Sequence, residues 1–376
     1  MSFNDAFNLK TNPFRITPAI SSDEIIWAGF SILKEKLERR IKRSIKISNS
    51  SLILNWGEYG SGKTHSARYF NKANTLQKLA ESVECKPPYS LVFTLPKGKE
   101  PVYDIFTSVI DKLDIANIRD RFSDVSFNLE ADVITKLTDN LLIQSVLKAI
   151  VDPNIDKSLL KKYLYGSATK TEISSINKSA HTDILRSLNK DNDYILLLSG
   201  LFTCLTYKKE VFSTIIIWID EFEDIAILSS SNIDKTNNFL REILDNTPNN
   251  LLIFVNLTQS ALLGVSDLGD YIYDSVRSRI KERINFELPS KDELKIYLKD
   301  ILKEYHITAN DENNYFPFTE HLIDEIINDL GNVSLRSFNE ALSLLLELAD
   351  MDNKQAPIAI EYYHEVKPEI IGWKNE

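Results

Sequence analysis

The chain has 376 residues, of which 43% are apolar and 26% charged, a balance that excludes a disordered chain, a collagen-like fibre and a disulfide scaffold. Its length predicts two domains or three. The net charge of −10 excludes a globally basic nucleic-acid protein, although a local basic patch stays compatible with nucleic-acid binding. Two distant cysteines, no signal-peptide core and no long apolar run predict a cytoplasmic protein without a membrane span.

Taken in chain order, residues 1–50 predict an irregular N-terminal arm, over about 1–25, and then a helix over 29–47. One face of that helix is basic, which is typical of a solvated helix and also of a surface that binds phosphates. The basic residues are Lys34, Lys36, Arg39, Arg40, Lys42, Arg43 and Lys46.

The segment 51–289 alternates apolar strand patterns with helical patterns, which predicts an α/β domain with a parallel sheet covered on both faces. The predicted strands are 51–56, 89–95, 214–224 and 251–259, and the predicted helices are 63–82, 101–113 and 234–245. A mostly helical insertion is expected at about 114–208, interrupted by a loop over 165–181. Residues 290–350 predict a helical lid domain, and 351–376 a C-terminal tail.

The clearest motif is a glycine-rich loop between the first predicted strand and the helix after it. It matches the pattern G-x-x-x-x-G-K-[ST] in full. The matching residues are Gly57, Glu58, Tyr59, Gly60, Ser61, Gly62, Lys63 and Thr64. Glycines let backbone N–H groups wrap phosphate oxygens, the lysine places a charge on the β- and γ-phosphates, and the threonine hydroxyl ligates Mg²⁺. We include His65 in the nucleotide-binding segment, with a helix-surface position as the alternative.

A second motif is the strand TIIIWIDEFED, which ends in acidic residues. Asp220 is expected to hold Mg²⁺, and Glu221 to act as the general base that activates water near the γ-phosphate. Glu223 and Asp224 are expected to be capping and surface charges, because acidic residues favour the start of a helix. No N-K-x-D guanine-reading motif is present, so ATP hydrolysis is the simplest reaction for this pair of motifs.

Three further signals follow along the chain. Asn256 ends the strand LLIFVN, where it would orient the attacking water, with Thr258 as the second candidate. Arginines stand just before the segment 284–290 and in the lid, at Arg277, Arg279 and Arg336. A guanidinium group suits the charge of a transferring phosphoryl group.

This ordered set of motifs resembles the AAA+ ATPases, over roughly residues 10–350. Within that family, the chain resembles the initiator and origin-recognition clade and the transposon target-selection ATPases. The segments NPF (12–14) and WAGF (27–30) resemble the N-terminal arm of that group. It implies that Asn256 is sensor 1, that Arg279, or else Arg277, is the arginine finger, and that Arg336 is sensor 2. The finger implies a homo-oligomer or an assembly with partner subunits.

Two departures qualify the resemblance. Initiators carry a C-terminal winged helix, and the 26 residues after position 350 are too few for one, so we expect that domain to be absent. The long insertion, with KKYLYGSATKTEISSI (161–176), resembles ATP-binding proteins of phage-defence systems of the BREX type. That implies a prokaryotic defence or mobile-element ATPase that acts with other defence or transposition subunits.

The sequence leaves three functions open. The first is an AAA+ ATPase that acts on DNA or a DNA-bound partner. The second is a nucleotide-gated signalling module that binds ATP with little turnover. The third is a DNA-binding adaptor with structural ATP, whose DNA binding would persist in a Lys63→Ala variant.

Overall fold

The computed structural model describes residues 2–14, 25–259, 268–308 and 313–371. The chain divides into two compact units. One comprises Met1–Lys36, Gly57–Tyr69 and Asn285–Glu376, and the other comprises Leu37–Trp56 and Phe70–Ile284. This partition is not the set of domain boundaries expected from the sequence, which stays a prediction.

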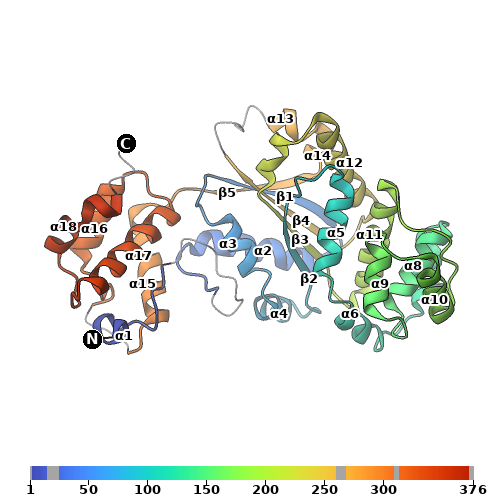
Figure 1. Ribbon diagram of the computed structural model, residues 1–376, viewed down its shortest axis with the longest axis horizontal. Coiled ribbons are helices and arrows are strands. Elements are labelled where there is room, and N and C mark those ends of the chain that lie inside the picture. The colour runs from blue at the N-terminus through green and yellow to red at the C-terminus, as the bar shows by residue number, and fades with distance from the viewer. Residues whose placement is uncertain (1, 15–24, 260–267, 309–312, 372–376) are drawn as a thin grey trace. The chain divides into compact units, whose positions relative to one another are not determined.

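A parallel sheet with the strand order β2-β3-β4-β1-β5 forms the centre of the second unit (Figure 1). Its strands are β1 (Ser50–Gly57), β2 (Tyr89–Thr94), β3 (Ile215–Asp220), β4 (Leu251–Thr258) and β5 (Ile280–Phe286). The predicted parallel α/β sheet is therefore confirmed. In register, β3 places Asp220 beside Thr94 of β2 and Ile219 beside Val255 of β4, so these strands end at one edge.

Both faces of the sheet are buried, which explains the continuous apolar strands of the sequence. On one face, Ile215, Ile217 and Ile219 share a hydrophobic core with apolar side chains of α5 (Pro101–Lys112), α11 (Asp191–Thr206) and α12 (Ser230–Asn246). On the opposite face Trp218 stacks on Phe254 with ring centroids 3.9 Å apart. The helix α2 (Ser31–Lys46) belongs to this unit from Leu37 onward, and the hydroxyl of its Ser44 lies 3.2 Å from that of Thr214.

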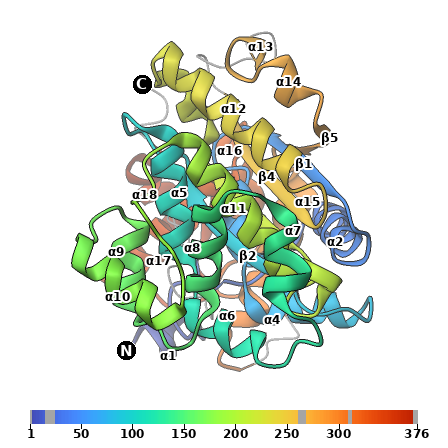
Figure 2. The ribbon, with the colours of Figure 1, turned by 90° about the vertical axis from the view of Figure 1, so that its right-hand side faces the viewer.

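The predicted helical insertion between the two motif strands is confirmed (Figure 2). It contains α6 (Ile115–Phe122), a π-helical turn η2 (Leu129–Ile134), α7 (Thr135–Leu137), α8 (Leu141–Val151), α9 (Lys157–Leu164) and α10 (Lys170–Ala180), and it leads into α11. The loop expected over 165–181 is wrong, because most of it is α10. That helix begins with a capping box in which Thr169 and Glu172 bond each other's backbone N–H groups.

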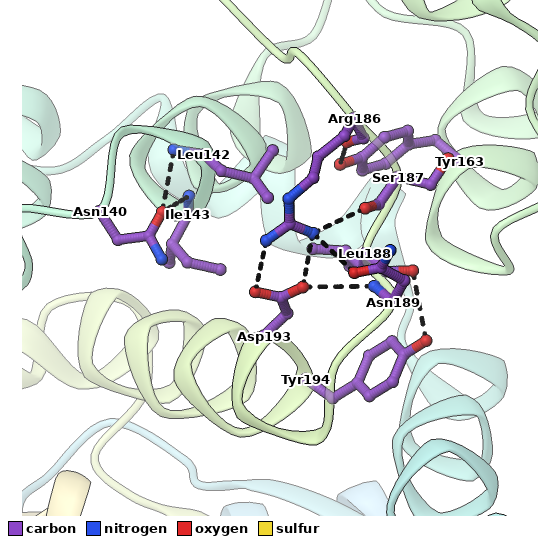
Figure 3. Close-up of polar contacts among 10 residues, drawn as sticks. All are labelled: Asn140, Leu142, Ile143, Tyr163, Arg186, Ser187, Leu188, Asn189, Asp193 and Tyr194. Carbon is purple, nitrogen blue, oxygen red and sulfur yellow. Dashed lines mark hydrogen bonds and ion pairs between the residues drawn. The ribbon is translucent and has the colours of Figure 1, made fainter.

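Buried polar contacts fix the insertion. The Arg186 guanidinium holds the Asp193 carboxylate at 2.7 and 3.0 Å, and the backbone N–H of Asn189 donates to the same carboxylate at 3.2 Å (Figure 3). Arg119 donates to the carbonyl oxygens of Ile150 at 2.9 Å and Ile155 at 2.7 Å, at the end of α8. These contacts satisfy backbone groups that would otherwise be buried without partners.

The remaining short elements of the second unit are α4 (Ala73–Glu81), η3 (Tyr207–Lys209), η4 (Phe222–Ile227), α13 (Leu268–Tyr271) and α14 (Asp274–Arg277). The helix predicted over 63–82 is therefore wrong as a single element. It is two helices, α3 (Lys63–Tyr69) and α4, and Phe70 at the break stacks on Trp218 in the core.

The first unit is helical. Its helices are α1 (Phe3–Phe7), α3, α15 (Lys291–Tyr305), α16 (Glu320–Leu330), α17 (Leu335–Met351) and α18 (Ile360–Ile371). The predicted helical lid is confirmed by α15 to α17. The segment expected as a C-terminal tail contains α18, in which Tyr363 is fully buried and its hydroxyl donates to Asp329 at 2.9 Å. The arm also begins with a helix, α1, while residues 15–24 of the expected irregular arm lie outside the described residues.

Within the described part of the chain, no helix has both the length and the apolar character that crossing a membrane requires.

Candidate functional site

The glycine-rich loop belongs to the first unit and leads from the end of β1 into α3. Gly60 and Gly62 have φ angles of 76° and 93°, which residues with a side chain rarely adopt. A Cβ atom at Gly57 would lie 2.3 Å from the carbonyl oxygen of Phe286. Glycine is therefore required at all three positions, by backbone conformation at two and by close packing at the third.

Lys63 is the first residue of α3 and is 6% exposed. Its ammonium group donates to the carbonyl oxygens of Gly57 at 2.9 Å and Glu58 at 2.8 Å, and to the Ser61 hydroxyl at 3.3 Å. The cation is thus turned into the loop. The next residue, Thr64, is half-buried in the first turn of the same helix.

Arg336 lies against the same loop, within the same unit. It stands in the first turn of α17, whose start is fixed by hydrogen bonds between Ser334 and Ser337. Its guanidinium group lies 4.9 Å from the centroid of the Tyr59 ring and bonds the Tyr59 hydroxyl. A Cβ atom added at Gly60 would lie 3.0 Å from the Arg336 Cβ. The arginine expected in the lid is therefore placed beside the glycine loop.

His65 contacts the N-terminal arm of the same unit. Its Nε2 atom lies 2.8 Å from the carbonyl oxygen of Ile26, and the Trp27 ring lies 6.2 Å away between centroids. The Trp27 ring also meets Tyr69 of α3 edge-on at 5.3 Å. The half-buried imidazole thus joins α3 to the segment 25–30, and is not simply a solvated helix position.

In the second unit, the end of β3 carries a buried polar relay. The Asn256 side-chain amide donates to Asp220 Oδ1 at 2.9 Å, and Asn256 Oδ1 accepts from the Asn55 amide at 2.8 Å. Asn55 and Asn256 are 0% exposed and Asp220 is 6% exposed. Because Asn55 occupies Oδ1, the amide nitrogen of Asn256 must face the Asp220 carboxylate.

Asn55 was missed by the sequence reasoning. The available signal was a lone amide in the strand pattern LILNW, two residues before the glycine loop. A buried amide in an apolar strand needs a partner, and here the partner lies on β4.

Glu221 follows β3 directly and adopts a left-handed conformation, with φ at 52°. Partial burial, followed by the nearby Asp220 and Asp224 carboxylates, raises the pKa of Glu221 above its ordinary value. Lys97 counteracts this and forms a 2.9 Å ion pair with Asp224. A carboxylate with a raised pKa is a stronger proton acceptor, which suits a general base.

The other residues of this segment have structural partners. The backbone N–H of Thr258 donates to Glu223 Oε2 at 3.0 Å, so Glu223 joins the end of β4 to η4. The second candidate for orienting water, Thr258, is therefore held through its backbone at the end of the strand next to β3.

Each candidate finger arginine is paired with a carboxylate of its own unit. Arg279 donates to both Asp245 oxygens of α12, at 2.8 and 2.7 Å. Arg277 bonds Asp274 in α14. About a third of the Arg279 side chain, 31%, is exposed. Within this chain, its guanidinium is thus held by a carboxylate.

The residues present fit a nucleotide with Mg²⁺. The glycine-rich loop has positive φ angles at Gly60 and Gly62 and turns the Lys63 ammonium group inward. Among the described residues no group of three or more His, Cys, Asp or Glu side chains could hold a metal by itself. Mg²⁺ needs fewer protein ligands than that, because it is usually bound by one or two carboxylates together with substrate phosphates and water.

Comparison with known proteins gives a fold. No protein-family model matches the chain, and no curated protein matches its sequence. Among solved structures it is similar to the Aeropyrum pernix ORC2 protein in its ADPNP–ADP complexes, with a TM-score of 0.52, 14% identity, and coverage of 89% of this chain and 66% of that chain. For the ADP form of that protein the TM-score is 0.51 and the identity 12%, with coverage of 88% of this chain and 66% of that chain. For Drosophila ORC bound to DNA the TM-score is 0.51 and the identity 11%, with coverage of 99% of this chain and 68% of that chain.

The chain therefore spans 66% of the length of the ORC2 structures. At these identities the likeness shows the fold and does not assign the site residues. It confirms the predicted resemblance at that level: the chain has the fold of the AAA+ ATPases, in the form found in origin-recognition proteins.

Proposed function

We propose that the protein binds ATP with Mg²⁺ and hydrolyses it to ADP and phosphate. The observation that carries this proposal is the loop Gly57–Thr64, in which glycines occupy positions closed to other residues and Lys63 is turned inward. Backbone N–H groups and an ammonium group in such a loop suit the β- and γ-phosphates. Arg336, in the first turn of α17 and in contact with Tyr59 of this loop, would add a second cation.

Hydrolysis would need the acidic end of β3 as well. Thr64 and Asp220 are the residues we propose for Mg²⁺, which when bound neutralises charge on the phosphates. Asn256 is held by Asn55 and Asp220, so its amide has one fixed orientation from which to position water. Glu221 would accept a proton from that water as the water oxygen bonds to the γ-phosphorus and the bond to ADP breaks.

The second part of the proposal is that a neighbouring subunit in an assembly completes the site with an arginine. Arg279, with Arg277 as the alternative, would leave its carboxylate and stabilise the phosphoryl group of a neighbouring subunit. ATP binding would then set the assembly and hydrolysis would reset it. One of the similar structures is an ORC bound to DNA, which supports DNA or a DNA-bound partner as the target. A phage-defence or mobile-element setting, with other subunits, remains a prediction from the sequence of the insertion.

Nucleotide binding and turnover test the two steps separately. Lys63→Ala is expected to abolish ATP binding, measured by calorimetry. Arg279→Ala is expected to leave binding by the isolated chain intact and to remove turnover. Loss of turnover in Arg277→Ala and not in Arg279→Ala would assign the finger to the alternative. Normal turnover in both arginine variants would contradict the assembly step. ATP binding without turnover in the wild type, at every protein concentration, would favour the nucleotide-gated module instead.

A further inference from the structure

Helix α2 presents a row of cations that the fold does not use. Its apolar side chains at Leu37, Ile41 and Ile45 are fully buried. Lys36, Arg39, Arg43 and Lys46 are exposed, at spacings of three and four residues that place them on one side of the helix. Arg40, expected on the basic face, is instead buried and bonds Ser51, so that part of the expectation is wrong.

These four cations have no ion-pair partner among the described residues, although Glu35 and Glu38 lie in the same helix. Helix α2 holds seven Lys and Arg residues against two Glu, a charge of +5. Subtracting +5 from the net −10 leaves −15 on the rest of the chain, so the basic charge is concentrated here.

A strained turn extends this surface at the end of α2. Lys208 and Lys209 both have positive φ angles, 49° and 58°, which cost free energy in residues with side chains. The Lys209 ammonium donates to the carbonyl oxygens of Ile45 at 2.6 Å and Lys46 at 3.0 Å, which closes the C-terminus of α2. Lys208 is exposed beside it. The strained turn thus lets Lys209 fix the basic end of α2 and adds Lys208 as a further exposed cation.

We propose that the part of this surface in the second unit, defined by Arg39, Arg43, Lys46 and Lys208, binds the sugar–phosphate backbone of nucleic acid without reading its bases. This deepens the proposed function, on which it rests for the setting, by naming where DNA is contacted. The helical cations Arg39, Arg43 and Lys46 span eight residues, or about 10 Å. Duplex DNA offers one charge for about every 1.7 Å of its axis, and arginine forks match phosphate oxygens.

The structure favours nucleic acid over a membrane surface. A helix that lies on a membrane buries its apolar face in the lipid, but the apolar face of α2 is already covered by protein. Ile32, 80% exposed, is the one large apolar side chain that α2 leaves open. What remains for a partner is charge, and counterion release from phosphates rewards clustered cations.

The test is the salt dependence of binding to a fluorescent duplex of arbitrary sequence. The triple variant Arg39→Gln, Arg43→Gln, Lys46→Gln removes three exposed cations of the surface. The matched control, Lys157→Gln, Lys170→Gln, Lys178→Gln, removes three exposed lysines of the insertion. Three lost phosphate contacts lower the salt slope by about 2.7. A rise from 50 to 200 mM salt should therefore weaken wild-type binding about 40-fold more than that of the triple variant.

The control triple is expected to keep the wild-type slope, and duplexes of different sequence are expected to bind alike. Equal slopes for the wild type and the α2 triple would overturn the proposal, as would wild-type binding to phosphatidylserine vesicles or polyglutamate but not to DNA. The ATPase proposal fails separately: loss of turnover in all proteins, with the DNA slopes as expected, would leave the α2 surface standing. The triple variant must retain wild-type ATP binding, which shows that it is folded.

Discussion

Replacing Asn55 with leucine tests the buried relay, because leucine has a similar size but cannot donate to Asn256. The lost bond is 2.8 Å long and lies between two fully buried side chains. Removing the Asn55 donor from the buried Asn256 Oδ1 costs about 1–3 kcal/mol. Part of this cost is offset, because leucine also removes Asn55 Oδ1, which is buried with no hydrogen-bond partner among the described residues. We therefore expect a net loss of about 1–2 kcal/mol in the free energy of unfolding.

The assay is urea unfolding of the single variants Asn55→Leu and Asn256→Leu and of the double variant. If the two amides bond each other, the double variant should lose about 1–2 kcal/mol less than the sum of the singles, because it has no orphaned amide oxygen. Single losses that add within about 0.3 kcal/mol would refute the relay. The proposed function adds a second readout: Asn55→Leu should lower kcat while ATP affinity stays unchanged, since only the orientation of Asn256 is released.

Asn55→Asp separates hydrogen bonding from packing. Burial raises the pKa of the introduced carboxyl above its unfolded value of about 3.9, and only the protonated form can donate to Asn256. An acid whose folded pKa is raised loses stability as the pH rises from the unfolded pKa through the folded pKa. The Asn55→Asp protein should therefore be closest to the wild type near pH 4.5 and weakest near pH 8. A constant difference between the Asn55→Asp and Asn55→Leu proteins across that range would contradict this.

Four further outcomes are expected. Gly60→Ala should weaken ATP binding about 5- to 30-fold, because it forces a side chain into a left-handed conformation at about 1–2 kcal/mol and against Arg336; calorimetry giving wild-type affinity would count against the loop geometry. Arg119→Met should cost about 2–4 kcal/mol in urea unfolding, since it leaves buried carbonyls of the insertion without a donor; a loss below about 0.5 kcal/mol would show that the cap is dispensable. The pH–rate profile should have its acidic limb above 4.5, the ordinary glutamate value, because turnover needs ionised Glu221 and its pKa is raised; a limb at or below that value would argue against this base. Burial raises the pKa of the Cys204 thiol to about 12, so iodoacetamide at pH 8 should label half-buried Cys85 first; equal rates by mass spectrometry would contradict the core assignment.

The sheet could be predicted because its strands are buried on both faces and therefore stand out as apolar runs. The helical errors have local causes. Helix α10 buries only Ile176, so it lacks an apolar stripe, and its signal was the capping pair Thr169 and Glu172. The break between α3 and α4 carries no glycine or proline, and depends on Phe70 entering the core against Trp218. Such a contact between distant segments leaves no local pattern.

The candidate site divides in the same way. The glycine loop and the acidic strand end are contiguous motifs, so their residues could be named from spacing. Asn55 could not, because its role comes from a partner 201 positions away on β4. Likewise, the basic face of α2 was visible in the sequence, but the burial of Arg40 and the closing contact from Lys209 depend on the folded chain.

The most direct test of the account is steady-state ATP turnover by the purified chain across protein concentrations, with Glu221→Gln as the matched variant. Wild-type turnover is expected to rise more than linearly with protein and to increase with duplex DNA, while the Glu221→Gln protein should bind ATP with wild-type affinity and turn it over far more slowly. Equal turnover by the two proteins would contradict the role of Glu221, and a wild type that does not bind ATP would contradict the nucleotide site itself.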